Sequence, residues 1–396
     1  MRRTRRVVGL LAVLTAFTFV AAACGDDSDS DSSSATTGGA DTTEGGAATT
    51  GASGEALPAC GGTSDIPGSA DNTLQTVEVT EAAGVNKNVG LMFDITGRGD
   101  QSFNDSAAAG LDKAQEDYGI GVSESTPTGD AVRAERMNLL IDQGNGLIIG
   151  VGFLWGDAIT AGTASAPDTQ FAIVDSVVEA PNATSLVFAE EQGSFLVGAA
   201  AAMKSQTGKI GFIGGVENEL IQKFEAGYVA GAQHVNPDIE VEVSYISQPP
   251  DFSGFNDAAK GKEIGASMFE NGADIVYAAA GGSGDGMFAA AQEYSEANDT
   301  VVCGIGVDSD QILTLGPELE TYVMTSMLKR VDVAVYNTIG KQVAGELTGG
   351  TVEVFDLSVN GVAYSTTGGN LEDIVGDLDD LKQQIIDGDI TVPTAP

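Results

Sequence analysis

Short apolar runs alternate with amphipathic stretches along most of the chain. The runs are continuous and too short for helices, which is typical of parallel strands buried on both faces. The stretches between them place apolar residues at helical spacing. This alternation predicts repeated strand–helix–strand units and an α/β fold with parallel sheets. The expected strands are residues 89–93, 147–151, 171–174, 210–213, 275–279 and 301–307, and the expected helices are residues 106–118, 131–143, 219–234, 258–271 and 286–297.

Polar residues and glycines stand at the ends of the expected strands. In open α/β sheets, ligands bind outside the carboxyl ends of the strands, so these positions outline a binding site. A glycine at any one of them is also explained by a tight turn from strand to helix. The strand ends are Asp94, Gly152, Asp175, Gly214, Gly215, Gly281, Gly282 and Asp308.

The first residues have the organisation of a secretory signal peptide. Four arginines precede an apolar run at residues 7–20, which is too short and too poorly flanked to remain as a membrane span. Small residues then lead to Cys24, an arrangement that resembles the bacterial lipobox, in which the cysteine is lipidated. We therefore expect a lipoprotein signal peptide at residues 1–23 and a lipid anchor on Cys24. An ordinary signal peptide with an incidental cysteine is the alternative.

A long polar segment separates this signal from the first expected strand. Residues 25–80 are almost entirely Ser, Thr, Gly, Ala and Asp, so they cannot bury enough apolar surface to offset the entropy of ordering. We expect residues 24–84 to be a disordered tether that holds the folded body away from the bilayer. The remaining chain is long enough for two domains of ordinary size.

Charge and composition exclude several classes of function. The chain has 18 Lys and Arg against 57 Asp and Glu, a formal net charge of −39, so it repels phosphate backbones and nucleic acid is not an expected partner. The sequence has a single histidine, His234, and no cysteine cluster. It therefore lacks the residues for a histidine-rich metal site and offers only one candidate base for a Ser-His triad. The glycine-rich segment at residues 281–286 matches no phosphate-loop pattern. We therefore expect neither an enzyme nor a bound cofactor or metal.

Two cysteines besides Cys24 leave one question open. Cys60 and Cys303 could form a disulfide outside the cytoplasm, although two cysteines do not make a disulfide framework. The alternative is that Cys303 is an ordinary buried strand residue.

Several stretches resemble a known family and follow its order. The opening stretch LMFDITGRGDQSFNDSAAAGL is similar to the D-x-G…D-x-SFN pattern of the basic membrane protein (BMP) family. These proteins are substrate-binding lipoproteins of ABC importers and include purine-nucleoside receptors. The likeness continues in VGFLWGDAI, FAIVD, EEQGSFLVGAAAA, KIGFIGG, KFEAGYVAG, AAKGKEIGASMFENGADIVYAAAGGSG, GVDSDQ and TSMLKRVDVAVYNTI, and so spans nearly the whole body.

The resemblance implies the type I periplasmic-binding-protein fold. In this fold two doubly wound α/β lobes, joined by three crossovers, close on the ligand. Mapped onto this sequence, lobe 1 comprises residues 85–182 and 326–348, and lobe 2 comprises residues 183–325 and 349–391. The cleft between them falls at the strand ends named above.

The resemblance also implies a set of ligand-binding residues. In nucleoside-binding members, the base lies between two aromatic rings from opposite lobes, while carboxylates and a lysine hold the ribose. The corresponding pair here is Phe103 and Phe224. Asp94 and Asn104 would face the base edge, Asp308 and Lys329 the sugar hydroxyls, and Asp175 and Gly282 complete the set.

Three of these residues also have an ordinary structural explanation. Phe103 could be a hydrophobic staple at the start of the following helix. Phe224 could be a core residue, and Lys329 could be a solvated residue before a helix. The resemblance does not decide whether Arg98 or Trp155 contacts a ligand.

Taken together, these features predict a lipid-anchored, monomeric receptor at the extracytoplasmic face of a bacterial membrane. It would capture a purine nucleoside and deliver it to an ABC permease. An alternative keeps the fold but binds a sugar or another small solute for uptake or sensing. A third possibility, of a different class, is an adhesin that presents the Arg-Gly-Asp tripeptide at residues 98–100.

Overall fold

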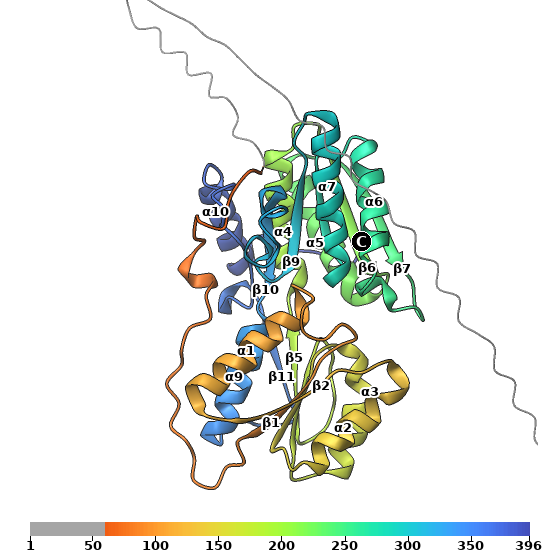
Figure 1. Ribbon diagram of the computed structural model, residues 1–396. Coiled ribbons are helices and arrows are strands. Elements are labelled where there is room, and N and C mark those ends of the chain that lie inside the picture. Colours follow the sequence, from red (N-terminus) through yellow and green to blue (C-terminus); the bar gives the residue numbers. More distant parts are fainter. Residues whose placement is uncertain (1–59) are drawn as a thin grey trace, which may run out of the picture. The chain divides into compact units, whose positions relative to one another are not determined.

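The computed structural model describes residues 60–396, which contain two six-stranded sheets (Figure 1). The predicted signal peptide, the lipidation of Cys24 and the first part of the predicted tether lie outside the described residues.

The first sheet, with the helices that cover it, forms lobe 1. Its strand order is β11-β5-β4-β3-β1-β2, and all neighbours are parallel. Helices α1 and α9 lie together on one face, and α2 and α3 cover the other (Figure 1). The strands are β1 (Asn88–Met92), β2 (Gly121–Ser125), β3 (Leu147–Gly150), β4 (Gln170–Val174), β5 (Ala183–Phe188) and β11 (Thr351–Phe355), and the helices are α1 (Phe103–Tyr118), α2 (Arg133–Asp142), α3 (Gly156–Ser165) and α9 (Val331–Ala344).

The second sheet repeats this arrangement in lobe 2. Its order is β12-β10-β9-β8-β6-β7, and only the β10–β12 pair is antiparallel. Helix α4 packs on α5, and α6 packs on α7 (Figure 1). The strands are β6 (Lys209–Val216), β7 (Glu240–Ser247), β8 (Ile275–Ala279), β9 (Cys303–Asp308), β10 (Val323–Lys329) and β12 (Val362–Tyr364), and the helices are α4 (Glu190–Lys204), α5 (Glu219–Val235), α6 (Ala258–Glu270), α7 (Gly284–Asn298), α8 (Gln311–Thr314) and α10 (Val375–Ile386).

Short 3₁₀ turns complete the described secondary structure. They are η1 (Ala70–Asn72), η2 (Asp130–Val132), η3 (Phe153–Trp155), η4 (Ser253–Phe255), η5 (Gly281–Ser283), η6 (Glu320–Tyr322) and η7 (Leu357–Val359).

The predicted α/β architecture is confirmed, because strands and helices form in the expected segments and the two sheets are dominated by parallel pairs. The chain passes from one lobe to the other three times, after β5, after β10 and after β11. The carboxyl ends of the parallel strands therefore face the space between the lobes.

The sheets divide the chain at different positions from the expected lobe boundaries. Strands β5 and β11 belong to the sheet of lobe 1, although residues 183–188 and 351–355 were expected in lobe 2. Conversely, all of β10 belongs to lobe 2. The apolar pattern identifies β5 as a strand but does not say which strand it pairs with. It pairs in parallel with β4, so that Phe171 faces Ala183, after a connection that contains no helix.

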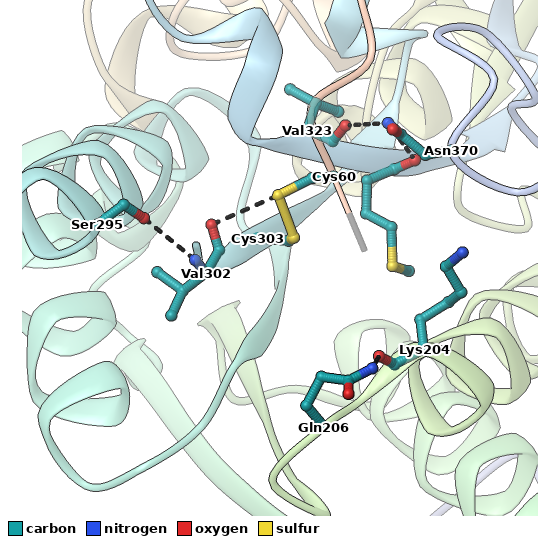
Figure 2. The surroundings of a disulfide bond; sticks show 9 residues. Cys60, Lys204, Gln206, Ser295, Val302, Cys303, Val323 and Asn370 are labelled. Atoms are coloured by element: carbon teal, nitrogen blue, oxygen red, sulfur yellow. Dashed lines mark hydrogen bonds between the residues drawn. A yellow bond between two sulfur atoms is a disulfide. The ribbon is translucent and has the colours of Figure 1, made fainter. Parts of the chain in front are cut away.

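Residues 60–84, which we call the strap, differ from the expected disordered tether. They form the red and orange segment that runs along both lobes in Figure 1. Cys60 and Cys303 form a disulfide with a Cα–Cα distance of 5.9 Å, shown in Figure 2, and this resolves the question that the sequence left open. The strap has no core of its own, but its backbone hydrogen bonds to the two lobes and the disulfide hold it in place.

Candidate functional site

A cavity lies between the lobes at the carboxyl ends of β1, β4, β9 and β10. Most of its wall is apolar, with a few converging polar groups, which is the usual composition of a small-molecule site. It is lined by Asp94, Ile95, Thr96, Asp100, Phe103, Asn104, Gly152, Phe153, Asp175, Leu220, Ile221, Phe224, Phe255, Ala279, Gly281, Val307, Asp308 and Lys329.

The structure brings nearly all of the predicted ligand-binding residues to this one cavity. Asp94, Phe103, Asn104 and Asp175 come from lobe 1, and Phe224, Asp308 and Lys329 come from lobe 2. Gly282 is the exception, because its neighbour Gly281 lines the cavity in its place. A Cβ added at Gly282 would lie 3.9 Å from the Cβ of Asp100, so Gly282 packs beside the opposite lobe and is not part of the wall.

The amine of Lys329 is the centre of the polar part of the cavity. It donates a 2.6 Å hydrogen bond to Oδ2 of Asp175 and lies 3.1 Å from Oε1 of Glu190. The Lys329 side chain is only 2% exposed, so this cation is held almost entirely by protein groups.

Three aromatic rings surround the same amine. It lies 5.2 Å from the ring centre of Phe103, 5.6 Å from that of Phe224 and 5.1 Å from that of Phe188. Phe103 begins α1 in lobe 1, and Phe224 lies on α5 in lobe 2. The two rings predicted to stack on a ligand therefore border one small volume from opposite sides of the cleft.

Burial shifts the ionisation of the charged groups around this amine. Burial alone would lower the pKa of Lys329, but the carboxylates of Asp175, Glu190 and Asp308 outweigh it and hold that pKa well above its ordinary value. Burial raises the pKa of Asp175 to about 6 and that of Asp308 to about 7, although Lys329 opposes both shifts. Of these two carboxyls, Asp308 therefore has the pKa nearer to neutral pH.

Asp175 and Asp308 occupy equivalent places in the two lobes. Each stands at the carboxyl end of the third strand from the same end of its sheet: Asp175 directly follows β4 in lobe 1, and Asp308 is the last residue of β9 in lobe 2. Both adopt a left-handed backbone conformation, with φ of 65° and 64°. Such strain in residues other than glycine is concentrated at functional sites, so the repeated geometry supports a role for both carboxylates.

Asp94, another cavity residue, is held by Asn104, which the resemblance provided, and by Arg133, which it did not. Nη2 of Arg133 donates a 2.8 Å hydrogen bond to Oδ1 of Asp94, and the side chain of Asn104 accepts one of 2.8 Å from the Asp94 backbone. The Arg133 guanidinium lies 4.8 Å from the ring centre of Trp155. Arg133 thus forms a buried ion pair with Asp94, and nothing in the local sequence at the start of α2 distinguishes it from a surface residue.

The structure also answers the questions about Trp155 and Arg98. Trp155 is fully buried in the core of lobe 1 and donates to the Phe93 carbonyl, so it does not line the cavity. The Arg98 guanidinium forms ion pairs with the carboxylates of Asp112 and Glu124, and Arg98 also lies outside the cavity wall.

The Arg-Gly-Asp tripeptide is not displayed as a loop tip. Asp100 is only 5% exposed, and its carboxylate accepts hydrogen bonds from the backbone of Ser102, Asn104 and Asp105. These bonds fix the loop before α1 and so position Phe103. This arrangement argues against the adhesin hypothesis.

The lobes touch across the cleft in several places. Oγ of Ser102 donates a 2.6 Å hydrogen bond to Oδ2 of Asp308, and Oγ of Ser309 donates one of 2.9 Å to the carbonyl of Ser102. Phe153 and Phe252 meet edge to face with ring centres 5.8 Å apart. The described conformation is therefore one in which the lobes are in contact around the cavity.

Within residues 60–396, no group of three or more metal-ligating side chains is arranged to hold a metal ion. Nor does any helix there have the length and apolar character needed to cross a bilayer.

The sequence is similar to one family over nearly the whole body. Residues 87–395 match the family described as "ABC transporter substrate-binding protein PnrA-like". The chain is 36% identical to the "ABC transporter nucleoside-binding protein BmpA" of Lactococcus lactis, a match that covers 77% of this chain and 88% of that protein. It is 34% identical to the "CD4+ T-cell-stimulating antigen" of Listeria innocua, over 87% and 96% of the two chains.

Solved structures support the same architecture. A solute-binding protein of an ABC transporter system from Aeropyrum pernix superposes with a TM-score of 0.68 at 29% identity, over 78% of this chain and 93% of that one. A second solute-binding protein, from Conexibacter woesei, has a TM-score of 0.63 at 20% identity over 78% and 98%, which supports the fold alone. The predicted type I periplasmic-binding-protein fold is thereby confirmed.

Proposed function

The chain belongs to the PnrA-like family of ABC-transporter substrate-binding proteins, and on this premise we propose that it captures a purine nucleoside between its lobes for delivery to a membrane permease. The family consists of binding proteins of transporters, not enzymes. The relative from Lactococcus lactis is named as nucleoside-binding, which supports the choice of ligand.

The observation that carries the proposal is the placement of Phe103 and Phe224. Both rings lie within 5.6 Å of the Lys329 amine, and they come from different lobes. A planar base between them would be stacked on both faces only when the lobes are together. Stacking of this kind is worth about 1–3 kcal/mol per base, and it links ligand binding to lobe closure.

The polar groups are divided in a way that suits a nucleoside. Asp94 and Asn104 are in contact with each other in the wall, and a carboxylate and an amide can bind the edge of a base. Asp175, Asp308 and Lys329 form a second polar group in the wall, in which carboxylates can accept strong hydrogen bonds from vicinal hydroxyls and the lysine can donate to a ribose oxygen.

Isothermal titration with adenosine, guanosine, their monophosphates and free ribose tests the proposal directly. We expect the nucleosides to bind at least about tenfold more tightly than the monophosphates, because a buried phosphate would face Asp94, Asp175 and Asp308. Free ribose should also bind more weakly, since it leaves both rings uncovered. Tighter binding of the monophosphates, or of ribose alone, would contradict a nucleoside receptor.

We expect nucleoside affinity to fall when the pH is lowered from 8 to 6. Asp308 has a pKa of about 7 and is approached by Lys329, Ser102, Asp100 and Asp175. Below that pH it is protonated and can no longer accept from two hydroxyls, so the dissociation constant should rise by up to about tenfold per pH unit. Titrations across this range measure it.

The Asp308→Asn variant is the control for this pH dependence. It should bind more weakly than the parent at pH 8 and should show a flatter profile, because the titrating group is gone. For the folding stability of the ligand-free protein, the pH dependence has the opposite direction to that of the nucleoside affinity. A raised carboxyl pKa in the folded state favours folding at low pH, so this contribution to stability is lost as the pH rises through about 7. A parent profile as flat as that of the variant would exclude Asp308 as the responsible group.

We further propose that Cys24 carries a lipid that anchors the protein outside the cytoplasm. The signal at residues 1–23 supports this, as does 31% identity to a relative named as a lipoprotein in Pyrococcus horikoshii. Cys24→Ala should move the protein from the membrane fraction to the soluble fraction of cells, as judged by immunoblot. Retention of the variant in the membrane would contradict lipidation at this position.

A further inference from the structure

Glu190 is a fully buried carboxylate whose role the cavity lining does not explain. It is 0% exposed and begins α4 immediately after the chain crosses from β5 into lobe 2. Its Oε1 lies 3.1 Å from the Lys329 amine, and its Oε2 pairs closely with the amine of Lys223. A buried carboxylate between two lysines is retained in a core only where the pairing is close, because its desolvation is costly.

These contacts form a chain of alternating charges from lobe 1 to lobe 2. Asp175 at the end of β4 binds Lys329, Lys329 meets Glu190, and Glu190 binds Lys223 on α5. Lys223 also donates a 2.8 Å hydrogen bond to the carbonyl of Phe188, the last residue of β5. Two of the three crossovers between the lobes follow β5 and β10, and we call these two crossovers the hinge segments. Glu190 lies in the first and Lys329 at the start of the second, so their contact connects the two hinge segments.

The hydrogen bonding around this chain is incomplete. Among the described residues, the buried Oδ1 of Asp175 receives no hydrogen bond, and the buried Oε1 of Glu190 has its 3.1 Å ion pair with Lys329 but no contact of good hydrogen-bond geometry. A buried acceptor without a donor is destabilising, so each one calls for a physical explanation. Both oxygens belong to residues that contact the Lys329 amine, which has three protons to donate.

On the premise of nucleoside capture, we propose that Glu190 is a positioning residue that fixes the Lys329 amine between Phe103 and Phe224 and couples it to the hinge. It acts through Lys329, since it does not itself line the cavity. Lys329 can then make its ligand contact only when the two hinge segments are correctly placed.

Glu190→Gln and Glu191→Gln form a matched pair of variants to test this. Glu191 is the next residue and is also buried, but its carboxylate lies 3.8 Å from Lys223 and makes no ion pair with Lys329 among the described residues. Glutamine has the shape of glutamate without its charge. We expect Glu190→Gln to weaken nucleoside binding by at least about tenfold, and Glu191→Gln by less than about threefold.

An alkaline pH profile separates positioning from a merely structural role. Three groups hold the charge of Lys329, namely Asp175, Glu190 and Asp308. In the parent protein, affinity should be constant from pH 8 to 10. In Glu190→Gln the alkaline loss of affinity should begin at a lower pH than in the parent, because Lys329 has lost one of its three carboxylate partners. Glu190→Asp keeps the charge and should restore the flat profile.

The outcomes distinguish this inference from the proposed function. If the parent protein binds no nucleoside, the proposed function fails. If the parent binds but Glu190→Gln matches Glu191→Gln in affinity and in alkaline profile, the role of Glu190 is overturned. Thermal melts of the ligand-free variants show whether each is folded. If Glu190→Gln is not folded, the comparison of Glu190→Asp with the parent protein tests the proposal instead.

A second inference rests on the strap, residues 60–84. Its first part is bound to lobe 2 through the disulfide, a 2.9 Å hydrogen bond from the Ser69 backbone to Thr366, and one of 2.9 Å from Asn72 to the Tyr364 carbonyl. Figure 2 shows Cys303 directly after Val302, whose backbone N–H donates a 3.1 Å hydrogen bond to Oγ of Ser295.

The second part of the strap is bound to lobe 1. The Val77 backbone donates to the hydroxyl of Tyr336, and its carbonyl accepts from Tyr118. The Ala82 backbone donates to the carbonyl of Val343 on α9. Between the two parts, the carbonyl of Asp71 accepts from Arg330, the residue at the β10–α9 crossover.

We infer that the strap is a fourth connection between the lobes and that the disulfide makes it a redox-sensitive clasp on the contacting conformation. Residues 72–76 join the two attachments and can span no more than about 18 Å when fully extended. Rotation of the lobes must therefore break attachments on one side. Reduction of the disulfide releases the covalent end and makes separation easier.

Reduction of the parent protein, with Cys60→Ser/Cys303→Ser as the comparison, tests the clasp. Dithiothreitol should weaken nucleoside binding by about threefold or more and should increase the radius of gyration of the ligand-free protein in solution scattering. The double variant should resemble the reduced parent and should not respond to dithiothreitol. If reduction of the disulfide, verified by thiol titration, changes neither quantity, the clasp is excluded.

Discussion

Replacement of Lys329 by methionine is expected to lower the free energy of unfolding by about 3–5 kcal/mol and to abolish measurable nucleoside binding. Methionine fills nearly the same volume, so the change removes the charge and leaves the packing largely intact. Asp175 and Glu190 would then be buried carboxylates without their shared cation. Removing one partner of a buried ion pair is far more destabilising than never having had the pair, because the remaining charge is desolvated without compensation.

Lys341→Met is the matched control. Lys341 pairs with Glu353, but its side chain is 41% exposed, so its loss should change the free energy of unfolding by no more than about 1 kcal/mol. Urea unfolding of both variants measures the difference. The defect of Lys329→Met should be smaller at pH 5 than at pH 8, since the stranded carboxylates then take up protons. Equal stability of the two variants would show that Lys329 is not balancing buried charge.

Phe103→Ala and Phe224→Ala should each weaken nucleoside binding by more than about tenfold, because each removes one face of the proposed sandwich. The two should differ in stability. Phe103 is half-buried at the cavity wall, so its loss should leave the melting temperature of the ligand-free protein nearly unchanged. Phe224 is only 3% exposed and belongs to the hydrophobic core, so its loss should lower the melting temperature as well. The structure thus supports part of the core explanation for Phe224 alongside its place at the cavity.

Phe269→Ala separates the two effects. Phe269 is fully buried on α6 and does not line the cavity. Its truncation should cost about 3–5 kcal/mol of stability while leaving the affinity of the folded protein unchanged. Titration calorimetry and thermal melts of the three variants give both quantities. If Phe103→Ala binds as tightly as the parent, the ring is a helix staple and the sandwich is wrong.

The sequence alone determined what depends on local periodicity and on short patterns. Continuous apolar runs made the parallel strands recognisable, and the polar residues that follow them placed Asp94, Asp175 and Asp308 at one edge of each sheet. The resemblance of the surrounding stretches added Phe103, Phe224 and Lys329, which do line the same cavity. These features are readable because burial and strand direction impose a pattern on neighbouring residues.

Only the tertiary structure decided which distant segments meet. It placed β5 and β11 in lobe 1, joined Cys60 to Cys303 across 243 residues, and laid the strap along both lobes. It also brought Glu190 to Lys329 and Arg133 to Asp94, while Gly282 fell outside the cavity wall. Because the chain contains so many acidic residues, nothing in the sequence around Glu190 distinguishes it from a glutamate on the surface. Whether it is solvated or buried against a lysine depends on surfaces that come together only when the lobes have formed.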